Sequence, residues 1–147
     1  MTNALYDKGR NAFAKGEIHW LASGGDDIKA CLLKTAYTPD LANHDFFDDL
    51  GANVVGNSGG ATRADCPALT EIDPVDGVCD ADDVTITAVP GAAGVCDYIC
   101  IFKDDGVADA SSPLLALIDT ATGLPVTPNG GDITIQWDAG ANKIFKL

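Results

Sequence analysis

Five cysteines are the residues of this chain best suited to chemistry, and their spacing limits what that chemistry can be. No two of them form a Cys-x-x-Cys pair, the spacing that structural zinc sites use, so the sequence indicates no metal site. Two interpretations stay open: thiols that pack as small hydrophobic residues, or disulfides within or between chains. The candidate disulfide cysteines are Cys31, Cys66, Cys79, Cys96 and Cys100.

The sequence around each cysteine separates these interpretations in part. Cys31, Cys96 and Cys100 lie in apolar stretches typical of strands, whereas Cys66 and Cys79 lie in turn-rich sequence and are the better disulfide candidates. On one regular strand Cys96 and Cys100 share a face about 13 Å apart at ~3.3 Å per residue, too far for a disulfide, whose Cα atoms lie within roughly 7 Å. The cysteine number is odd, so at least one thiol is unpaired or intermolecular.

The expected compartment bears on the same question. The first residues contain no basic segment followed by an apolar stretch, so we expect synthesis in a cytosol, where disulfides do not normally persist. A particle assembled in the cytosol and then released would meet oxidising conditions later. That sequence of events reconciles the cysteine content with the compartment.

Motifs of catalysis are missing from the sequence. It contains no Gly-x-Ser-x-Gly elbow, phosphate-binding loop, dinucleotide-binding glycine pattern or His-Glu-x-x-His pair. The two histidines, His19 and His44, have no spacing to a cysteine that favours a nucleophile dyad. The densest group of aspartates, residues 73–83, lacks the calcium-binding EF-hand frame and is interpreted as turn residues. We therefore predict a protein that is not an enzyme, with no catalytic residue, cofactor or metal.

The charge balance excludes whole classes of partner. Nine Lys and Arg against 22 Asp and Glu give a net charge of −13, so the surface repels nucleic-acid phosphates and anionic membranes. The longest apolar runs, residues 98–102 and 114–118, are far shorter than the ~20 residues of a membrane span.

Hydrophobic periodicity places these residues on elements. Helical spacing covers residues 2–16, and a helical turn or two is predicted over 43–50. Alternation predicts strands whose ranges are 27–34, 84–88, 95–103, 114–119, 133–137 and 143–147, with short candidates at 69–72 and 78–79. The strand at 114–119 is nearly all apolar and is expected at a sheet centre. Trp137 alternates with Ile133 and Ile135, which favours a core position over a ligand platform.

These elements predict an all-β fold, an antiparallel β-sandwich or Greek-key-like domain with a short N-terminal helix or arm. Residues 1–22 are the expected N-terminal helix or arm, and residues 23–147 a single β domain. A helix of this chain or an arm that docks on a neighbour both fit the first segment.

Several stretches resemble a family of small β-rich structural proteins from the head gene cluster of tailed bacteriophages. The resemblance lies in residues 121–147 (ATGLPVTPNGGDITIQWDAGANKIFKL) and in the shorter pieces 27–33, 37–39, 44–46, 82–86 and 101–104. It covers most of the chain as sequence texture and includes no mechanistic motif. The five cysteines depart from the family, in which few or none are expected, and suggest cross-linking particular to this protein.

The resemblance implies a non-enzymatic virion protein that decorates the outside of a phage capsid and stabilises it by bridging capsid subunits. The expected partners are the major capsid protein or other virion proteins and further copies of the chain as a homo-oligomer, with no nucleic acid and no membrane. The expected location is the virion exterior, after assembly in the host cytoplasm. The alternatives are a neck, collar or tail component of the same virion, or a ligand- or receptor-binding β module.

Overall fold

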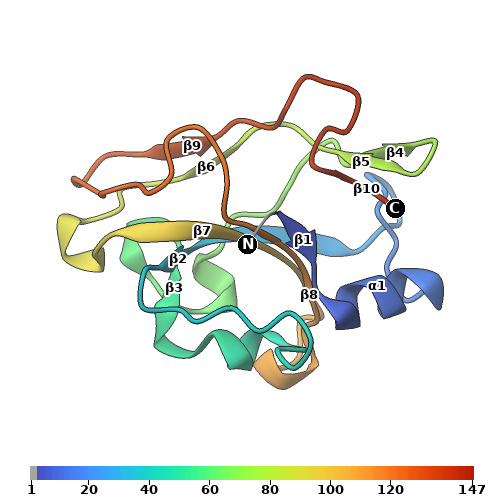
Figure 1. Cartoon of the computed structure of the whole chain (residues 1–147), viewed down its shortest axis with the longest axis horizontal. Coiled ribbons are helices and arrows are strands. Elements are labelled where there is room, and N and C mark those ends of the chain that lie inside the picture. The colour runs from blue at the N-terminus through green and yellow to red at the C-terminus, as the bar shows by residue number, and fades with distance from the viewer. Residues whose placement is uncertain (1–2) are drawn as a thin grey trace.

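A five-stranded antiparallel sheet forms the centre of the fold. The structure is a computed structural model that describes residues 3–147. In spatial order the strands are β1 (Ala4–Leu5), β8 (Leu114–Ile118), β7 (Cys96–Asp104), β2 (Asp27–Lys34) and β3 (Val54–Val55). The long strands β2 and β7 cross the middle of the molecule (Figure 1). All five residues of β8 are buried, as its apolar run predicts for a strand inside a sheet.

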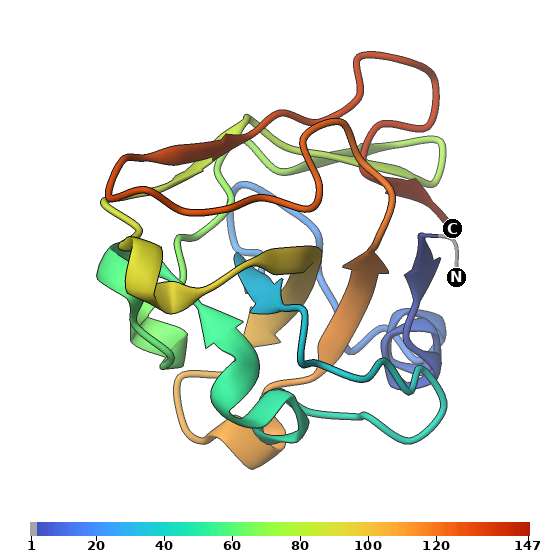
Figure 2. The ribbon, with the colours of Figure 1, turned by 60° about the vertical axis from the view of Figure 1, so that its left-hand side comes forward.

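Two smaller antiparallel sheets lie over one face of this central sheet (Figures 1 and 2). One contains β10 (Phe145–Lys146), β5 (Val78–Asp80) and β4 (Asp73–Val75) in that order, and the other pairs β6 (Val84–Ile86) with β9 (Ile133–Ile135). The protein is therefore mostly β with antiparallel sheets, as the sequence predicts.

The helices are short. They are α1 (Asp7–Ala14) and the 3₁₀ helices η1 (Phe47–Asn53), η2 (Asn57–Gly59), η3 (Arg63–Asp65), η4 (Gly91–Ala93) and η5 (Asp109–Ser111). The helical segment predicted over 43–50 thus begins later, at Phe47. Within residues 3–147, none of the helices has the length and apolar character needed to cross a membrane.

Both faces of the central sheet are buried, and each carries its own hydrophobic core. On β2, Ile28, Ala30 and Leu32 belong to the first core, beneath the two smaller sheets. Cys31 and Leu33 point to the opposite side. There they join the second core, whose buried members are Tyr6, Cys31, Leu33, Tyr37, Phe47, Leu50, Val54, Cys66, Cys100, Phe102, Leu114 and Leu117.

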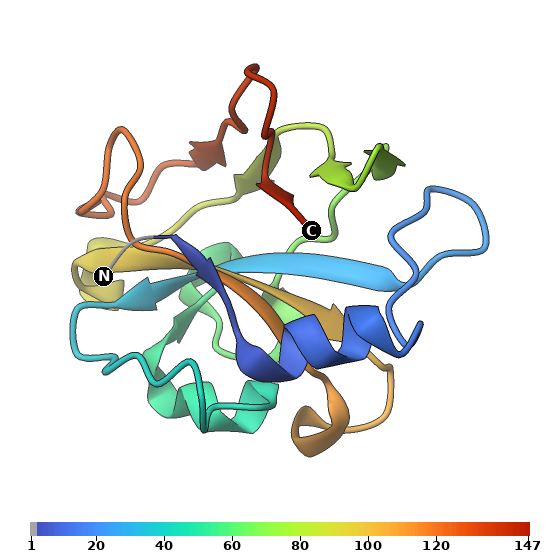
Figure 3. The same ribbon diagram turned by 45° about the vertical axis from the view of Figure 1, so that its right-hand side comes forward.

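The N-terminal segment is built into both cores. The helix predicted over 2–16 begins only at Asp7, because Ala4 and Leu5 pair with β8 as strand β1. Figure 3 shows α1 running beside the β1–β8 edge of the sheet. Within residues 3–22, the buried side chains are those of Tyr6, Ala12, Ile18 and Trp20.

One predicted strand is wrong. Residues 69–72 have irregular backbone, and strand pairing starts at Asp73 instead. Leu69 and Ile72 are nevertheless buried in the first core, so their apolar character reflects burial and not strand geometry. The last two predicted strands are shorter than expected, since β9 ends at Ile135 and β10 is only Phe145–Lys146.

Candidate functional site

All five cysteines are buried free thiols. They divide between the two cores: Cys31, Cys66 and Cys100 belong to the second core, Cys79 and Cys96 to the first. Cys66 and Cys79, the preferred candidates from sequence, therefore lie in different cores and no bond joins them. The three cysteines of the second core are called the thiol cluster below.

Cys96 and Cys100 do not share a face of β7, so that expectation is wrong. The β2–β7 ladder shifts register at Leu33 and Lys34: Leu33 pairs with Tyr98, but Lys34 pairs with Cys96. The extra residue is a β-bulge, and it reverses the alternation beyond it. Cys96 consequently faces the first core, where burial raises the pKa of its thiol to about 11. Burial likewise raises the pKa of Cys79 to about 12.

The thiol cluster centres on Cys31. Cys31 lies directly opposite Cys100 in the β2–β7 ladder, and its thiol interacts with the thiols of both Cys100 and Cys66. The Cys66 thiol also donates a hydrogen bond to the carbonyl oxygen of Thr62 at 3.3 Å. The thiol contacts, followed by burial, raise the pKa of Cys31 well above its ordinary value. Cys31 is therefore a neutral thiol at physiological pH.

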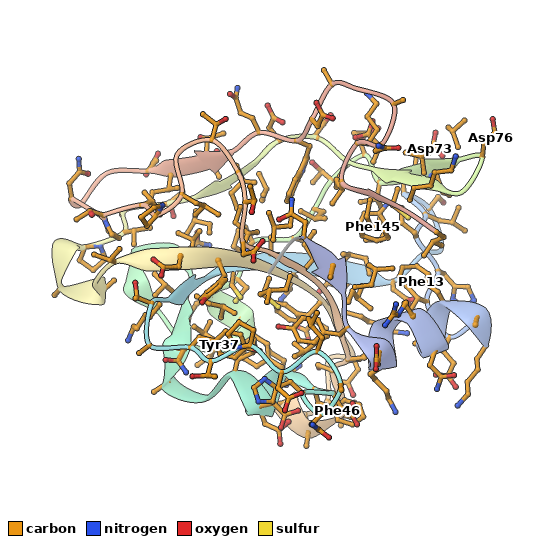
Figure 4. The ribbon with its side chains drawn as sticks, viewed as in Figure 1. Phe13, Tyr37, Phe46, Asp73, Asp76 and Phe145 are labelled. Atoms are coloured by element: carbon orange, nitrogen blue, oxygen red, sulfur yellow. The ribbon has the colours of Figure 1, made fainter. Side chains whose placement is uncertain are left out.

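A hydrogen-bonded chain of side chains crosses the same core. The Tyr6 and Tyr37 hydroxyls are 2.9 Å apart, and the Tyr37 hydroxyl lies 2.7 Å from Nδ1 of His44. Burial is the main cause that raises the pKa of each tyrosine. The chain joins the residue before α1 to the loop after β2, so it ties two segments together. Figure 4 shows Tyr37 beneath the central sheet.

Asp104 at the end of β7 and Asp109 in η5 form ion pairs with basic side chains. The Lys29 Nζ donates to Oδ2 of Asp104 at 2.8 Å, and the Arg63 guanidinium donates to Asp104 and, at 2.5 Å, to Oδ1 of Asp109. Burial acts to raise the pKa of Asp104, but hydrogen bonds from Lys29 and from a backbone N–H, with the nearby charge, bring it below the usual range. Within residues 3–147, no group of three or more His, Cys, Asp or Glu side chains has an arrangement that could hold a metal ion.

A cavity of about 700 Å³ lies between the central sheet and the segment around β9. Leu32, Ile99 and Ile118 line it from the sheet, and Ile133 and Trp137 from the other side. The Trp137 side chain is half-buried and packs against the first core, as its alternation predicts. Its indole N–H donates to the carbonyl oxygen of Asp82 at 3.0 Å. Apolar side chains thus form only slightly more than half of the lining, and polar ones such as Gln136, Asp138 and Lys143 contribute to the rest.

The loop after α1, the β4–β5 hairpin and strand β10 meet at one end of the molecule. The Trp20 ring packs edge-on against Phe145 of β10 at 5.2 Å, and Phe145 packs against Phe13 of α1 at 5.8 Å. The Trp20 indole N–H also donates to the carbonyl oxygen of Asp80, the last residue of β5. Figure 4 shows Phe13 and Phe145 between α1 and the C-terminal strand. This aromatic group fixes the loop after α1 to the β4–β5 hairpin.

The same three segments expose apolar side chains. Leu21 is 45% exposed, Val75 61% and Leu147 56%. The backbone N–H of Leu147 donates to Gly77 in the turn of the hairpin, so the last residue lies beside it. Asp76 projects at the turn of that hairpin, and Asp73 lies at the other end of β4 (Figure 4). We call these three exposed apolar side chains, Leu21, Val75 and Leu147, the end surface.

No protein-family model matches the chain, and no curated protein matches it.

Proposed function

We propose that this protein is a non-enzymatic virion structural protein that decorates and stabilises the outside of a bacteriophage capsid by bridging capsid subunits. The end surface is the observation that carries the proposal. Single exposed apolar residues are normal on proteins, but here three of them lie on connected segments: Trp20 packs on Phe145 of β10, and β10 belongs to the same sheet as the β4–β5 hairpin. The sequence resemblance to phage head proteins supplies the class of partner.

The geometry of the hairpin favours side-chain docking over strand addition. Asp76 and Gly77 have φ of 53° and 78°, so the hairpin closes with a tight two-residue turn. The Cys79 carbonyl accepts from Ile144 on the β10 side, which leaves Pro74, paired with Cys79, with its backbone facing the open edge. Proline has no N–H to offer a new strand there. A partner therefore contacts the side chains of the end surface.

The charge supports a position outside the shell. A net charge of −13 opposes contact with packaged DNA and favours solubility at the high local concentration of a decorated particle. A copy that contacts two neighbouring capsid subunits adds interface area that must separate before the shell ruptures. As part of the same proposal, we assign the layered strands to an antiparallel sandwich of Greek-key type, since the first core lies between the central sheet and the smaller sheets.

Binding to capsids that lack the protein tests the end surface. We expect Val75→Asp to weaken binding at least about tenfold, because a carboxylate would have to be desolvated against the partner. Val107→Asp is the matched control: Val107 is 81% exposed and lies in the loop between β7 and η5, away from the end surface. Equal binding by wild type and Val75→Asp would contradict docking through this surface.

A further inference from the structure

The thiol cluster has a geometry that ordinary packing of buried cysteines does not require. Two neighbours flank Cys31 within the sheet plane, Cys100 on β7 and the segment that follows η3 on the other side. That segment pairs antiparallel with β2: Lys29 is bridged to Ala68, and the Ala30 N–H donates to the Pro67 carbonyl. This short ladder ends there, since Leu32 pairs with Val55 of β3 on the same side of β2. Cys66, the residue before Pro67, lies at the end of the ladder, where its thiol interacts with that of Cys31.

The two neighbours differ in how they are held against Cys31. Ala30 N–H points away from β7, so by alternation Cys31 points its backbone groups toward β7 and forms a hydrogen-bonded pair with Cys100. Cys66 lies beyond the last hydrogen bond of its short ladder, so strand pairing does not fix its distance from Cys31. Disulfides take Cα separations of roughly 4.4–6.8 Å, and the ~5.5 Å of a hydrogen-bonded pair is within that range, so the choice of partner depends on which side can move.

Mobility and access also favour Cys66. Cys100 is fixed in a central strand that is paired on both sides, whereas Cys66 follows a single 3₁₀ turn and precedes a proline in irregular backbone. The Cys66 side can therefore adjust to disulfide geometry without breaking a ladder. Cys66 is 3% exposed and Cys31 and Cys100 are 0% exposed, so an oxidant meets Cys66 first.

We propose that the thiol cluster is a redox site in which a small disulfide oxidant, of the glutathione disulfide class, converts Cys31 and Cys66 into an intrachain disulfide. Cys66 loses its proton and attacks one sulfur of the oxidant, which forms a mixed disulfide and releases one glutathione thiol. Cys31 then loses its proton and attacks the Cys66 sulfur, which forms the Cys31–Cys66 bond and releases the second glutathione thiol. Two protein thiols are oxidised and one glutathione disulfide is reduced to two thiols, so atoms and electrons balance.

We expect disulfide formation at this site to be slow. Thiolates are the attacking species. Cys31 is held as a neutral thiol and all three cysteines are buried, which limits attack while the protein is folded. In a reducing cytosol the three groups stay thiols, and prolonged exposure to an oxidising medium closes the bond. The bond links β2 to the segment after η3 and leaves Cys100 as a thiol. This inference concerns the isolated chain and stands or falls separately from the capsid role.

Native oxidation of the purified full chain tests the proposal. The protein is incubated without denaturant in glutathione disulfide, its remaining thiols are alkylated, and the intact mass and the linked peptides are measured. We expect a loss of two alkylated sites, a cross-linked peptide that contains Cys31 and Cys66, and a rise of about 5–10 °C in Tm that a dithiol reductant reverses. Five alkylated cysteines after oxidation, or a bond that omits Cys31 or Cys66, would overturn the proposal.

Cysteine variants supply the controls. The double variant Cys79→Ala with Cys96→Ala keeps the cluster intact and is expected to form the same bond, since both residues lie in the first core. Cys31→Ala is expected to form no intrachain disulfide, and a bond that persists in it contradicts the assignment. If Cys31→Ala does not fold, Cys66→Ala provides the same test from the less constrained side of the pair.

Discussion

Among single residues, Tyr37 shows most clearly how a polar group is accommodated inside the second core. Its hydroxyl is the middle member of the chain from Tyr6 to His44, and the Tyr6 side chain is fully buried. A buried hydroxyl without a partner loses its hydration with nothing in exchange. The stability of this region therefore depends on the pair and not on either tyrosine alone.

Replacing Tyr37 by Phe should lower the free energy of unfolding by about 1–3 kcal/mol, because the Tyr6 hydroxyl is left buried and unpaired. Urea denaturation measures the change. Tyr98→Phe is the control, since no hydrogen bond of the Tyr98 hydroxyl occurs within residues 3–147 although its ring packs against Tyr37 at 5.9 Å. The control should change stability by less than about 0.5 kcal/mol. Equal effects of the two substitutions would mean that the hydroxyl chain contributes nothing.

The cysteines show which part of the site the sequence can predict. Period-2 spacing is local, so the strand predicted over 27–34 forms, with Cys31 on the face opposite Ile28, Ala30 and Leu32. The bulge between Cys96 and Tyr98 depends on the pairing with β2, which is not local, so the face of Cys96 was predicted wrongly. The approach of Cys66 to Cys31 is likewise a contact across 35 positions, and no short-range pattern signals it.

At the scale of elements, Gly9 governs how α1 sits on the sheet. A Cβ at this position would lie 2.8 Å from the backbone carbonyl oxygens of Leu114 and Leu115, the first two residues of β8. Glycine weakens an isolated helix by about 1 kcal/mol relative to alanine. Here it permits the close approach that buries Ala12 and fixes the N-terminal segment.

Gly9→Ala therefore brings two opposing effects, a gain of about 1 kcal/mol in helix propensity and an overpacking cost of about 1–3 kcal/mol. We expect overpacking to dominate, because the clashing atoms belong to the backbone and cannot rotate away, so the free energy of unfolding falls. Asn11→Ala, on the exposed side of α1, should leave stability equal or slightly higher. Thermal unfolding of both variants decides the matter, and a Gly9→Ala protein more stable than wild type would show that α1 is not closely packed.

The long elements could be predicted and the short ones could not. Strands β2, β7 and β8 have five to nine residues of strong hydrophobic pattern, and their predicted ranges agree with the structure within about one residue. Strands β1 and β3 have only two residues each and exist because a long neighbour pairs with them. Their formation depends on tertiary contacts, as does the later start of α1.

For the whole molecule, the proposed role rests on two properties: the net charge and the exposed apolar side chains of the end surface. The cores bury most of the large apolar side chains. Three of the five that are exposed within residues 3–147, Leu21, Val75 and Leu147, lie on connected segments of a strongly acidic chain. Such an arrangement suits a protein that docks by one end and leaves its charged remainder in solvent. The location of the end surface could not be predicted from sequence, since Leu21, Val75 and Leu147 are far apart along the chain.

The most direct test of this account is the number of copies of the chain per copy of the major capsid protein in purified, intact phage particles. Quantitative mass spectrometry of such particles gives the ratio. A protein that decorates the shell and bridges its subunits predicts a ratio near one or a simple fraction of one. A handful of copies per particle would contradict decoration and indicate a neck, collar or tail component, and absence from particles would contradict a virion role altogether.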